Sequence, residues 1–193
     1  MKRLLIGFGV LFLGCAASAQ TKTKNEPKKE AKASAAPVAP VSSVLRAKAE
    51  IKGVDGKKLG TVTLEQLGHG VLVSGEFADL PPGGHAFHVH EVGKCEAPFQ
   101  TAGGHFNHAQ RKHGVRAADG AHAGDLPNLF ANETGKVKFE VVAHDISLKE
   151  GAGNVFDADG SAFVLHATVD DYQSDPAGNA GGRIACGVIT AEK

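Results

Sequence analysis

The stretches LGTVTLE (residues 59–65) and VLVSGEF (residues 71–77) decide the fold. In both, apolar residues alternate with polar ones, as Val62 and Leu64 illustrate. Because successive side chains of a strand point to opposite faces, this period of two predicts strands that bury one face and expose the other. Two such strands cannot stand alone, so more are expected outside them.

Short segments of the same kind recur along the chain, separated by turns rich in Gly, Pro, Asn and Asp. They lie at residues 46–52, 86–91, 136–143, 162–169 and 183–189. Seven or eight short strands in one domain predict an all-β sandwich or barrel. Residues 93–130 and 170–182 do not alternate, and long loops of this kind in a compact domain are usually functional.

The first 19 residues have the layout of an export signal. Two basic residues precede an apolar run over residues 4–14, and small residues follow at 17–19. The run is shorter than the roughly 20 residues that a transmembrane helix needs, so we expect cleavage rather than anchoring. A second interpretation stays open, because residues 13–15 resemble the lipobox at which bacterial lipoproteins are acylated, here on Cys15.

Residues 20–43 are rich in Lys, Ala and Pro and have almost nothing to bury, which predicts a disordered linker. The folded domain is expected over residues 44–193, a length that suits one domain with its own core. That domain has 14 basic residues against 19 acidic ones. It therefore lacks the basic footprint of a nucleic-acid-binding protein.

Only Cys95 and Cys186 remain once Cys15 is removed or lipidated. An even pair of cysteines in an exported chain is typical of a disulfide. The alternative is two free thiols or a soft-metal site, but the chain lacks the close cysteine spacing of thiolate zinc sites.

Ten histidines are many for 193 residues. His88 and His90 are two apart on a predicted strand, so they face the same side and can chelate one ion. His166 offers a third imidazole from another predicted strand. The loop between them carries His105, His113, His122 and Asp125. Imidazoles with one carboxylate and no thiolate suit zinc or copper.

Several segments together resemble the copper/zinc superoxide dismutase family. AFHVHE (86–91) is similar to its copper-ligand strand, and GGHFN (103–107) to the segment that holds its metal-bridging histidine. KHG (112–114) and HAGDL (122–126) are similar to its zinc-binding loop. GNAGGRIACGVI (178–189) resembles its C-terminal signature. The segments follow the family's order from residue 44 to the end, and this joint order is far more specific than any one segment.

The resemblance implies two metal cofactors, one copper and one zinc ion per chain. The implied copper ligands are His88, His90, His105 and His166. The implied zinc ligands are His105, His113, His122 and Asp125, so His105 bridges the two ions. Asp170 matches the carboxylate that links His88 with His113. Arg183 matches the arginine that binds the substrate anion, and Cys95 and Cys186 match the intrachain disulfide.

The implied fold is a Greek-key antiparallel β-sandwich or barrel, immunoglobulin-like, with eight strands and long metal-binding loops. The implied activity converts superoxide to O₂ and hydrogen peroxide. Copper cycles between Cu(II) and Cu(I), zinc is structural, and His105 leaves copper to carry a proton. The implied location is the bacterial periplasm, either free or tethered as a lipoprotein through Cys15. A homodimer stays open, because no motif marks a dimer face.

The chain also departs from the family pattern. The loop at 170–183 lacks the acidic and lysine cluster that guides substrate in the eukaryotic members, so Lys94 and Lys112 are candidate replacements. His108 stands where the family has proline, and we expect a solvated loop histidine, with an adventitious ligand as the alternative. We expect a structural hydrogen-bonding role for His85, while His69 and His144 have no assigned role.

A rival function is a periplasmic copper/zinc-binding or metallochaperone-like protein without turnover. It predicts the loss of a copper ligand or of Arg183, and this chain retains them all.

Overall fold

A computed structural model describes residues 45–192 of the chain. The predicted signal segment, Cys15 and the predicted linker lie outside the described residues. The described part contains ten strands and one short 3-10 helix. They are β1 (Arg46–Gly53), β2 (Lys58–Gln66), β3 (Val71–Phe77), β4 (Gly83–His85), β5 (Phe87–His90), η1 (Gln100–Ala102), β6 (Leu129–Ala131), β7 (Val137–Ala143), β8 (Ala162–His166), β9 (Arg183–Val188) and β10 (Thr190–Ala191).

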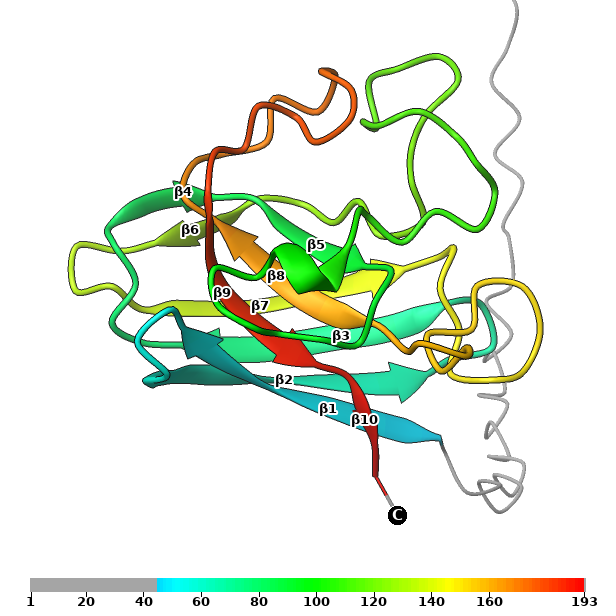
Figure 1. Ribbon diagram of the computed structural model, residues 1–193, viewed down its shortest axis with the longest axis horizontal. Coiled ribbons are helices and arrows are strands. Elements are labelled where there is room, and N and C mark those ends of the chain that lie inside the picture. The colour runs from blue at the N-terminus through cyan, green and yellow to red at the C-terminus, as the bar shows by residue number, and fades with distance from the viewer. Residues whose placement is uncertain (1–44, 193) are drawn as a thin grey trace, which may run out of the picture. The chain divides into compact units, whose positions relative to one another are not determined.

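The main sheet has the strand order β5-β8-β9-β1-β2-β3-β7, and β10 pairs with β1 (Figure 1). All these pairings are antiparallel. After β3 the chain leaves this edge to form β4 and β5, and β7 takes the place beside β3. This crossover is of the Greek-key type, so the predicted all-β fold is confirmed.

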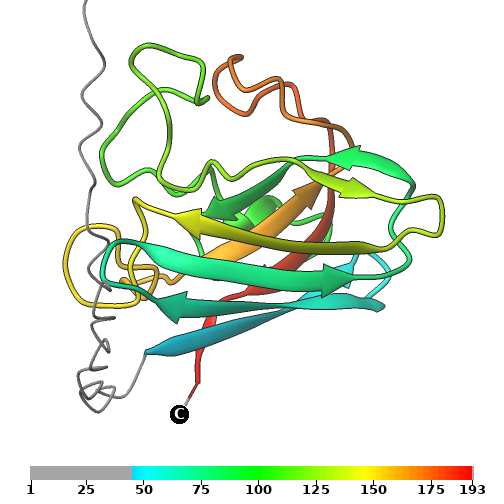
Figure 2. The same ribbon diagram turned by 180° about the vertical axis from the view of Figure 1, so that it is seen from behind.

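A second, two-stranded sheet of β4 and β6 joins the two edges of the main sheet. Only Ala86 separates β4 from β5 at one edge, and a short turn joins β6 to β7 at the other. The chain itself therefore closes the curled sheet toward a barrel, as the view from behind also shows (Figure 2). Closure of this kind protects strand edges from pairing with other chains.

The alternation seen in the sequence becomes a buried face and an exposed face. In β1 every second residue is buried, and Val62 and Leu64 of β2 are likewise buried. These side chains pack with Phe87, Phe163 and Leu165 in one hydrophobic core. Burying a large apolar side chain contributes about 1.5–3 kcal/mol, so this inner face provides most of the stabilisation.

β5 and β8 differ from the other strands because every one of their residues is buried. Phe87 and Val89 point into the core, while Ala162 and Val164 belong to a small second cluster with Phe99 and Cys186. The loop after β5 covers that outer face. Full burial on both faces explains why these strands alternate less clearly in the sequence.

Cys95 and Cys186 form a disulfide with a Cα–Cα distance of 5.6 Å, which confirms the predicted pairing. It ties the loop after β5 to β9 across a sequence separation of 91 residues. Within residues 45–192 we find no helix with the length and apolar character needed to span a membrane.

The strand bounds differ in detail from the predicted segments. β5 covers residues 87–90 of the predicted strand 86–91, and β8 ends at His166, earlier than residue 169. β6 begins inside the stretch 93–130 that we predict to be irregular and ends one residue beyond it. These short pieces contain only three to five residues, too few for a period to be recognised.

Candidate metal centre

β5 and β8 present three histidines on one face. In the antiparallel pairing His88 lies opposite Val164 and His90 opposite Ala162, and His166 follows two residues after Val164. Residues opposite each other share a face, and residues two apart along a strand do too. His88, His90 and His166 therefore project from the outer face, where the long loops lie over them (Figure 1).

The long loop after β5 returns to pair with the free edge of that strand. The amide of Phe106 donates to the Val89 carbonyl at 2.8 Å, and the amide of Val89 donates to the Gly124 carbonyl at 3.0 Å. A Cβ at position 124 would collide with the Val89 carbonyl, so only glycine fits here. This pairing brings His105 and Asp125 beside His90 and His88, respectively.

Four histidines form the first cluster, and their nearest ring nitrogens all lie within 4.8 Å of one another. They are His88, His90, His105 and His166. Each has one buried nitrogen without a hydrogen-bond partner: Nδ1 of His88 and Nε2 of the other three. Buried polar atoms are rarely left unpaired, so four converging bare nitrogens indicate a ligand site. We call these four residues the copper-side cluster.

The opposite nitrogens of three of these rings are anchored. Nε2 of His88 donates to Asp170 at 2.9 Å, Nδ1 of His90 donates to the Gly103 carbonyl at 3.0 Å, and Nδ1 of His166 to the Gly181 carbonyl at 3.3 Å. A neutral imidazole that donates from one nitrogen keeps a lone pair on the other. The anchors therefore turn a lone pair of each ring toward the common centre.

Four residues form the second cluster, again with their ligand atoms within 4.8 Å of one another. They are His105, His113, His122 and Asp125, which we call the zinc-side cluster. Nδ1 of His105, His113 and His122 lies 2.8, 3.1 and 3.3 Å, respectively, from a carboxylate oxygen of Asp125. The amides of Gly114 and His122 also donate to Asp125. A carboxylate thus occupies the middle of this cluster.

Burial and neighbouring groups shift the pKa values of these residues. Burial lowers the pKa of His105 to about 4 and that of His166 to about 3. Burial opposes ionisation of Asp125, but hydrogen bonds from the three imidazoles outweigh it and hold its pKa well below the usual range. His105 and His166 are therefore neutral at pH 7 and present lone pairs, as metal ligands must.

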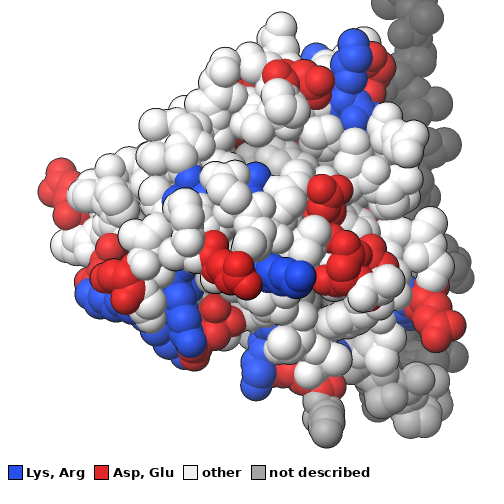
Figure 3. Space-filling view, in the orientation of Figure 1, with Lys and Arg blue, Asp and Glu red and all other residues white. Residues whose placement is uncertain are grey.

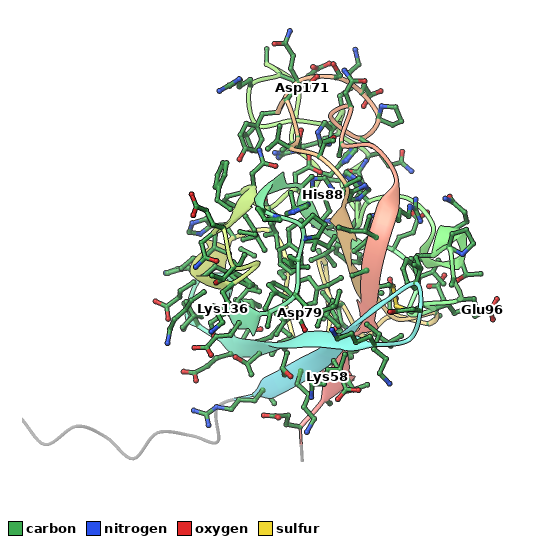
Figure 4. The ribbon with its side chains drawn as sticks, turned by 90° about the vertical axis from the view of Figure 1, so that its left-hand side faces the viewer. Lys58, Asp79, His88, Glu96, Lys136 and Asp171 are labelled. Carbon is green, nitrogen blue, oxygen red and sulfur yellow. A yellow bond between two sulfur atoms is a disulfide. The ribbon has the colours of Figure 1, made fainter. Side chains whose placement is uncertain are left out.

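Asp170 joins the two clusters. Its carboxylate accepts from Nε2 of His88 at 2.9 Å and from Nε2 of His113 at 3.0 Å. Burial lowers the pKa of His113, but its interactions with the carboxylates of Asp125 and Asp170, which accept from the ring, outweigh this and raise the pKa to about 9. Figure 4 shows His88 inside the domain, below the loop that carries Asp171.

Sequence reasoning missed the groups that hold Asp170 in place. The Asn128 amide donates to the Asp170 carbonyl, and its side-chain oxygen accepts from the Asp170 amide. The Tyr172 amide donates to the Asp170 carboxylate at 2.6 Å. The Gly103 and Gly181 carbonyls were missed as well. Main-chain anchors have no signature in the side-chain sequence, whereas Asn128 could have been suspected as a polar residue next to predicted ligands.

A cleft of about 700 Å³ opens onto the centre and is lined by His105, His122, His166 and Arg183, among others. Arg183 is the one lysine or arginine lining it within the described residues, and Glu91 is the one carboxylate. Arg183 donates to the carbonyls of Phe99 and Gly103, both at 2.7 Å. A larger groove of about 860 Å³ lies beside the disulfide and contains no histidine.

The two candidate steering lysines do not line the cleft. Lys94 lies in the larger groove, and Lys112 is exposed and 3.5 Å from Asp119. His85 has the expected structural role, because its ring nitrogens contact the His166 and Pro81 carbonyls.

A family model described as copper/zinc superoxide dismutase (SODC) matches residues 58–189, more than half of the chain. The chain belongs to the copper/zinc superoxide dismutase family. It is 45% identical to the copper-zinc superoxide dismutase 1 of Aquifex aeolicus over 152 residues, covering 77% of this chain and 90% of the relative. It is also 45% identical to the copper-zinc superoxide dismutase of Caulobacter vibrioides over 147 residues, covering 74% and 84%.

Other relatives in this family are named only as superoxide dismutase-like proteins. The superoxide dismutase-like protein YojM of Bacillus subtilis is 36% identical over 198 residues, covering 98% of this chain and 96% of the relative. A crystal structure of a superoxide dismutase-like protein from Bacillus subtilis, mutated to histidine at a tyrosine and a proline, has a TM-score of 0.71 and 41% identity. It covers 73% of this chain and 95% of that one.

The donor set of this family member fits the metals that the family implies. The copper-side cluster consists of imidazoles alone, and imidazole suits copper. The zinc-side cluster has three imidazoles and one carboxylate, a set that zinc accepts in tetrahedral sites. Four bare nitrogens face one another in the copper-side cluster, and Nδ1 of His113 is bare beside Asp125 in the zinc-side cluster.

Proposed function

We propose that this protein is a superoxide dismutase with one copper and one zinc ion per chain. The observation that carries the proposal is the set of four bare histidine nitrogens beside a cleft whose one lining cation is Arg183. Two superoxide anions and two protons then yield one O₂ and one hydrogen peroxide.

The copper-side cluster would hold copper through His88, His90, His105 and His166. When bound, copper supplies the one-electron oxidation and reduction that dismutation needs and that zinc cannot perform. His105 belongs to both clusters and lines the cleft, so it is placed to carry a proton at Nε2 to the substrate. Its Nδ1 stays with the zinc-side cluster and keeps the ring oriented.

Arg183 would bind the superoxide anion. Its two hydrogen bonds to main-chain carbonyls fix the guanidinium at the cleft, so little reorganisation is needed when the anion arrives. Over the β1 and β2 region of the face shown in Figure 3, charges of both signs lie intermingled. The attraction for a small anion is therefore expected to act locally, through Arg183.

The zinc-side cluster would hold zinc as a structural and electrostatic ion. Asp125 ties three imidazoles and the amides of Gly114 and His122 together. Together with a bound zinc ion, these groups would fix the loop and keep Nδ1 of His105 oriented.

We also propose that the protein is exported to an oxidising compartment, as the predicted signal segment suggests. The disulfide supports this location, because disulfides persist in the periplasm and in secreted proteins and are rare in the cytosol.

The alternative is a copper- and zinc-binding protein without turnover. The relatives that are named superoxide dismutase-like are the reason to test it. The deciding experiment measures superoxide dismutation by the purified protein when metal-free, zinc-loaded, and copper- and zinc-loaded. Turnover only with copper, and its loss in His166→Ala, would establish the enzyme. Tight binding of both metals without turnover would refute the catalytic proposal and leave the alternative.

A further inference from the structure

Three histidines outside the metal centre share one cleft. Six of the ten histidines belong to the two clusters, and His85 is buried and hydrogen-bonded. The other three, His69, His108 and His144, all line a cleft of about 540 Å³. All the histidines that neither cluster nor the core accounts for are therefore gathered in one place.

Three different segments bring these histidines together. His69 lies in the turn between β2 and β3, and His144 directly follows β7. The pair Val71 and Ala143 ends the β3–β7 ladder, and a Cβ on Gly70 would collide with the main chain at residues 143 and 144. The two chain segments are thus in contact one residue from His69. Figures 1 and 2 both show the loop after β7, in yellow, beside the β2–β3 turn.

His108 reaches the same cleft from the loop that carries His105. Its Nε2 lies 3.1 Å from the Asp145 carbonyl, which can only accept, so Nε2 donates. In the neutral ring Nδ1 then keeps its lone pair. The same arrangement, a ring nitrogen anchored on a main-chain carbonyl, prepares His90 and His166 in the metal centre.

We propose that this cleft is an accessory binding site for a divalent transition-metal ion, with His69, His108 and His144 as ligands; Asp145 and Lys149 also line it. Imidazoles with one carboxylate suit Zn²⁺, Cu²⁺ and Ni²⁺ rather than Mg²⁺ or Ca²⁺. Among the described residues only the two clusters of the metal centre already have their ligand atoms within 4.8 Å. The accessory histidines are exposed, so side-chain rotation closes the site when the ion binds.

The test uses the protein loaded with one copper and one zinc ion, so that the metal centre is filled before the probe is added. Ni²⁺ is the probe, because its mass distinguishes it from both resident metals in native mass spectrometry. We expect one Ni²⁺ per chain to bind while copper and zinc are retained. The loss of a metal-anchoring group typically costs about tenfold or more in affinity, so each of His69→Gln, His108→Gln and His144→Gln should weaken Ni²⁺ binding at least that much.

The triple variant of these three exposed residues should fold normally, lose the bound Ni²⁺ and keep the superoxide dismutation of the parent. Glu140→Gln, which removes an exposed carboxylate on β7 outside the cleft, is the matched control and should bind Ni²⁺ like the parent. Equal Ni²⁺ binding by the parent and the triple variant would overturn the proposal. Displacement of zinc or copper without a third bound ion would overturn it too.

Discussion

The copper-side and zinc-side clusters, the two halves of the metal centre, differ in the groups at their middle. In the copper-side cluster four ring nitrogens point at one another with nothing between them. In the zinc-side cluster the carboxylate of Asp125 stands among three imidazoles and also accepts from two amides. The first half consists of unsatisfied acceptors that await a cation, whereas the second half carries its own negative charge.

This difference indicates which of the two clusters keeps its shape in the absence of metal. A buried carboxylate that is paired and hydrogen-bonded stabilises the loop that surrounds it without any metal. Four bare nitrogens contribute no attraction of their own and cost desolvation. We therefore expect the zinc-side loop to keep its shape in the metal-free protein, with the copper-side rings held mainly by their anchors on Asp170 and on main-chain carbonyls.

The strongest test compares Asp125→Ala with His166→Leu in metal-free protein. Removing the buried carboxylate leaves polar groups uncompensated and should lower the free energy of unfolding by about 3–5 kcal/mol. His166→Leu removes a bare nitrogen together with one long hydrogen bond, so it should change stability by less than about 1 kcal/mol. Urea unfolding in the presence of a chelator measures both. Equal losses of unfolding free energy in the two variants would show that the two clusters do not differ in this way.

Asp170→Asn tests the link between the halves. His88 and His113 bond to different carboxylate oxygens of Asp170, and an amide replaces one of these acceptors with a donor, so one of the two rings loses its partner. Affinity for both metals should fall by about 10–100-fold, measured by competition with a chelator. The matched control is Asp171→Asn, because Asp171 bonds within its own loop to Ser174 and Asn179. If only one metal were affected, Asp170 would serve one half alone.

Gly178→Ala should disturb the same link without replacing a titratable side chain. Gly178 has a φ of +64°, and a Cβ there would collide with the Asp170 carboxylate. The carboxylate is displaced rather than removed, so metal affinity should fall by about tenfold, less than in Asp170→Asn. Gly182→Ala in the same loop meets nothing within 4 Å and should leave metal affinity unchanged. Equal behaviour of the two variants would contradict this account.

The smallest effect concerns the open side of the centre. Glu91 lines the same cleft as Arg183, and its negative charge opposes the attraction of Arg183 for an anion. Glu91→Gln removes this charge but keeps an oxygen that accepts from the Gly104 amide. A unit charge about 10 Å away in water is worth ~0.4 kcal/mol, so kcat/KM for superoxide should rise about twofold. The gain should shrink at high salt. A gain that is independent of salt would assign Glu91 a role other than electrostatic repulsion.

Strands with one exposed face were predictable from the sequence. β1, β2 and β3 alternate because one face meets water, and their predicted limits agree closely with the structure. β4 and β6, with three residues each, have too few residues to show a period. Their pairing also depends on how the sheet curls, which is a property of the whole chain.

The candidate site was predictable in its ligands but not in its supports. The histidines and Asp125 were recognisable because their side chains carry the chemistry, whereas their division into two ligand sets rested on the family resemblance. The structure places them in two clusters. Whether they bind copper and zinc stays a prediction. The Gly103 and Gly181 carbonyls, the Asn128 brace and the placement of Lys94 and Lys112 away from the cleft all depend on tertiary geometry.

One main-chain oxygen contacts both Arg183 and a ring of the copper-side cluster. The Gly103 carbonyl accepts from Nη2 of Arg183 at 2.7 Å and from Nδ1 of His90 at 3.0 Å. If Arg183 is replaced, this oxygen loses one donor, becomes a stronger acceptor for His90 and makes that imidazole more basic. An Arg183 variant is therefore never a pure probe of anion binding, because it also changes the basicity of the His90 ring.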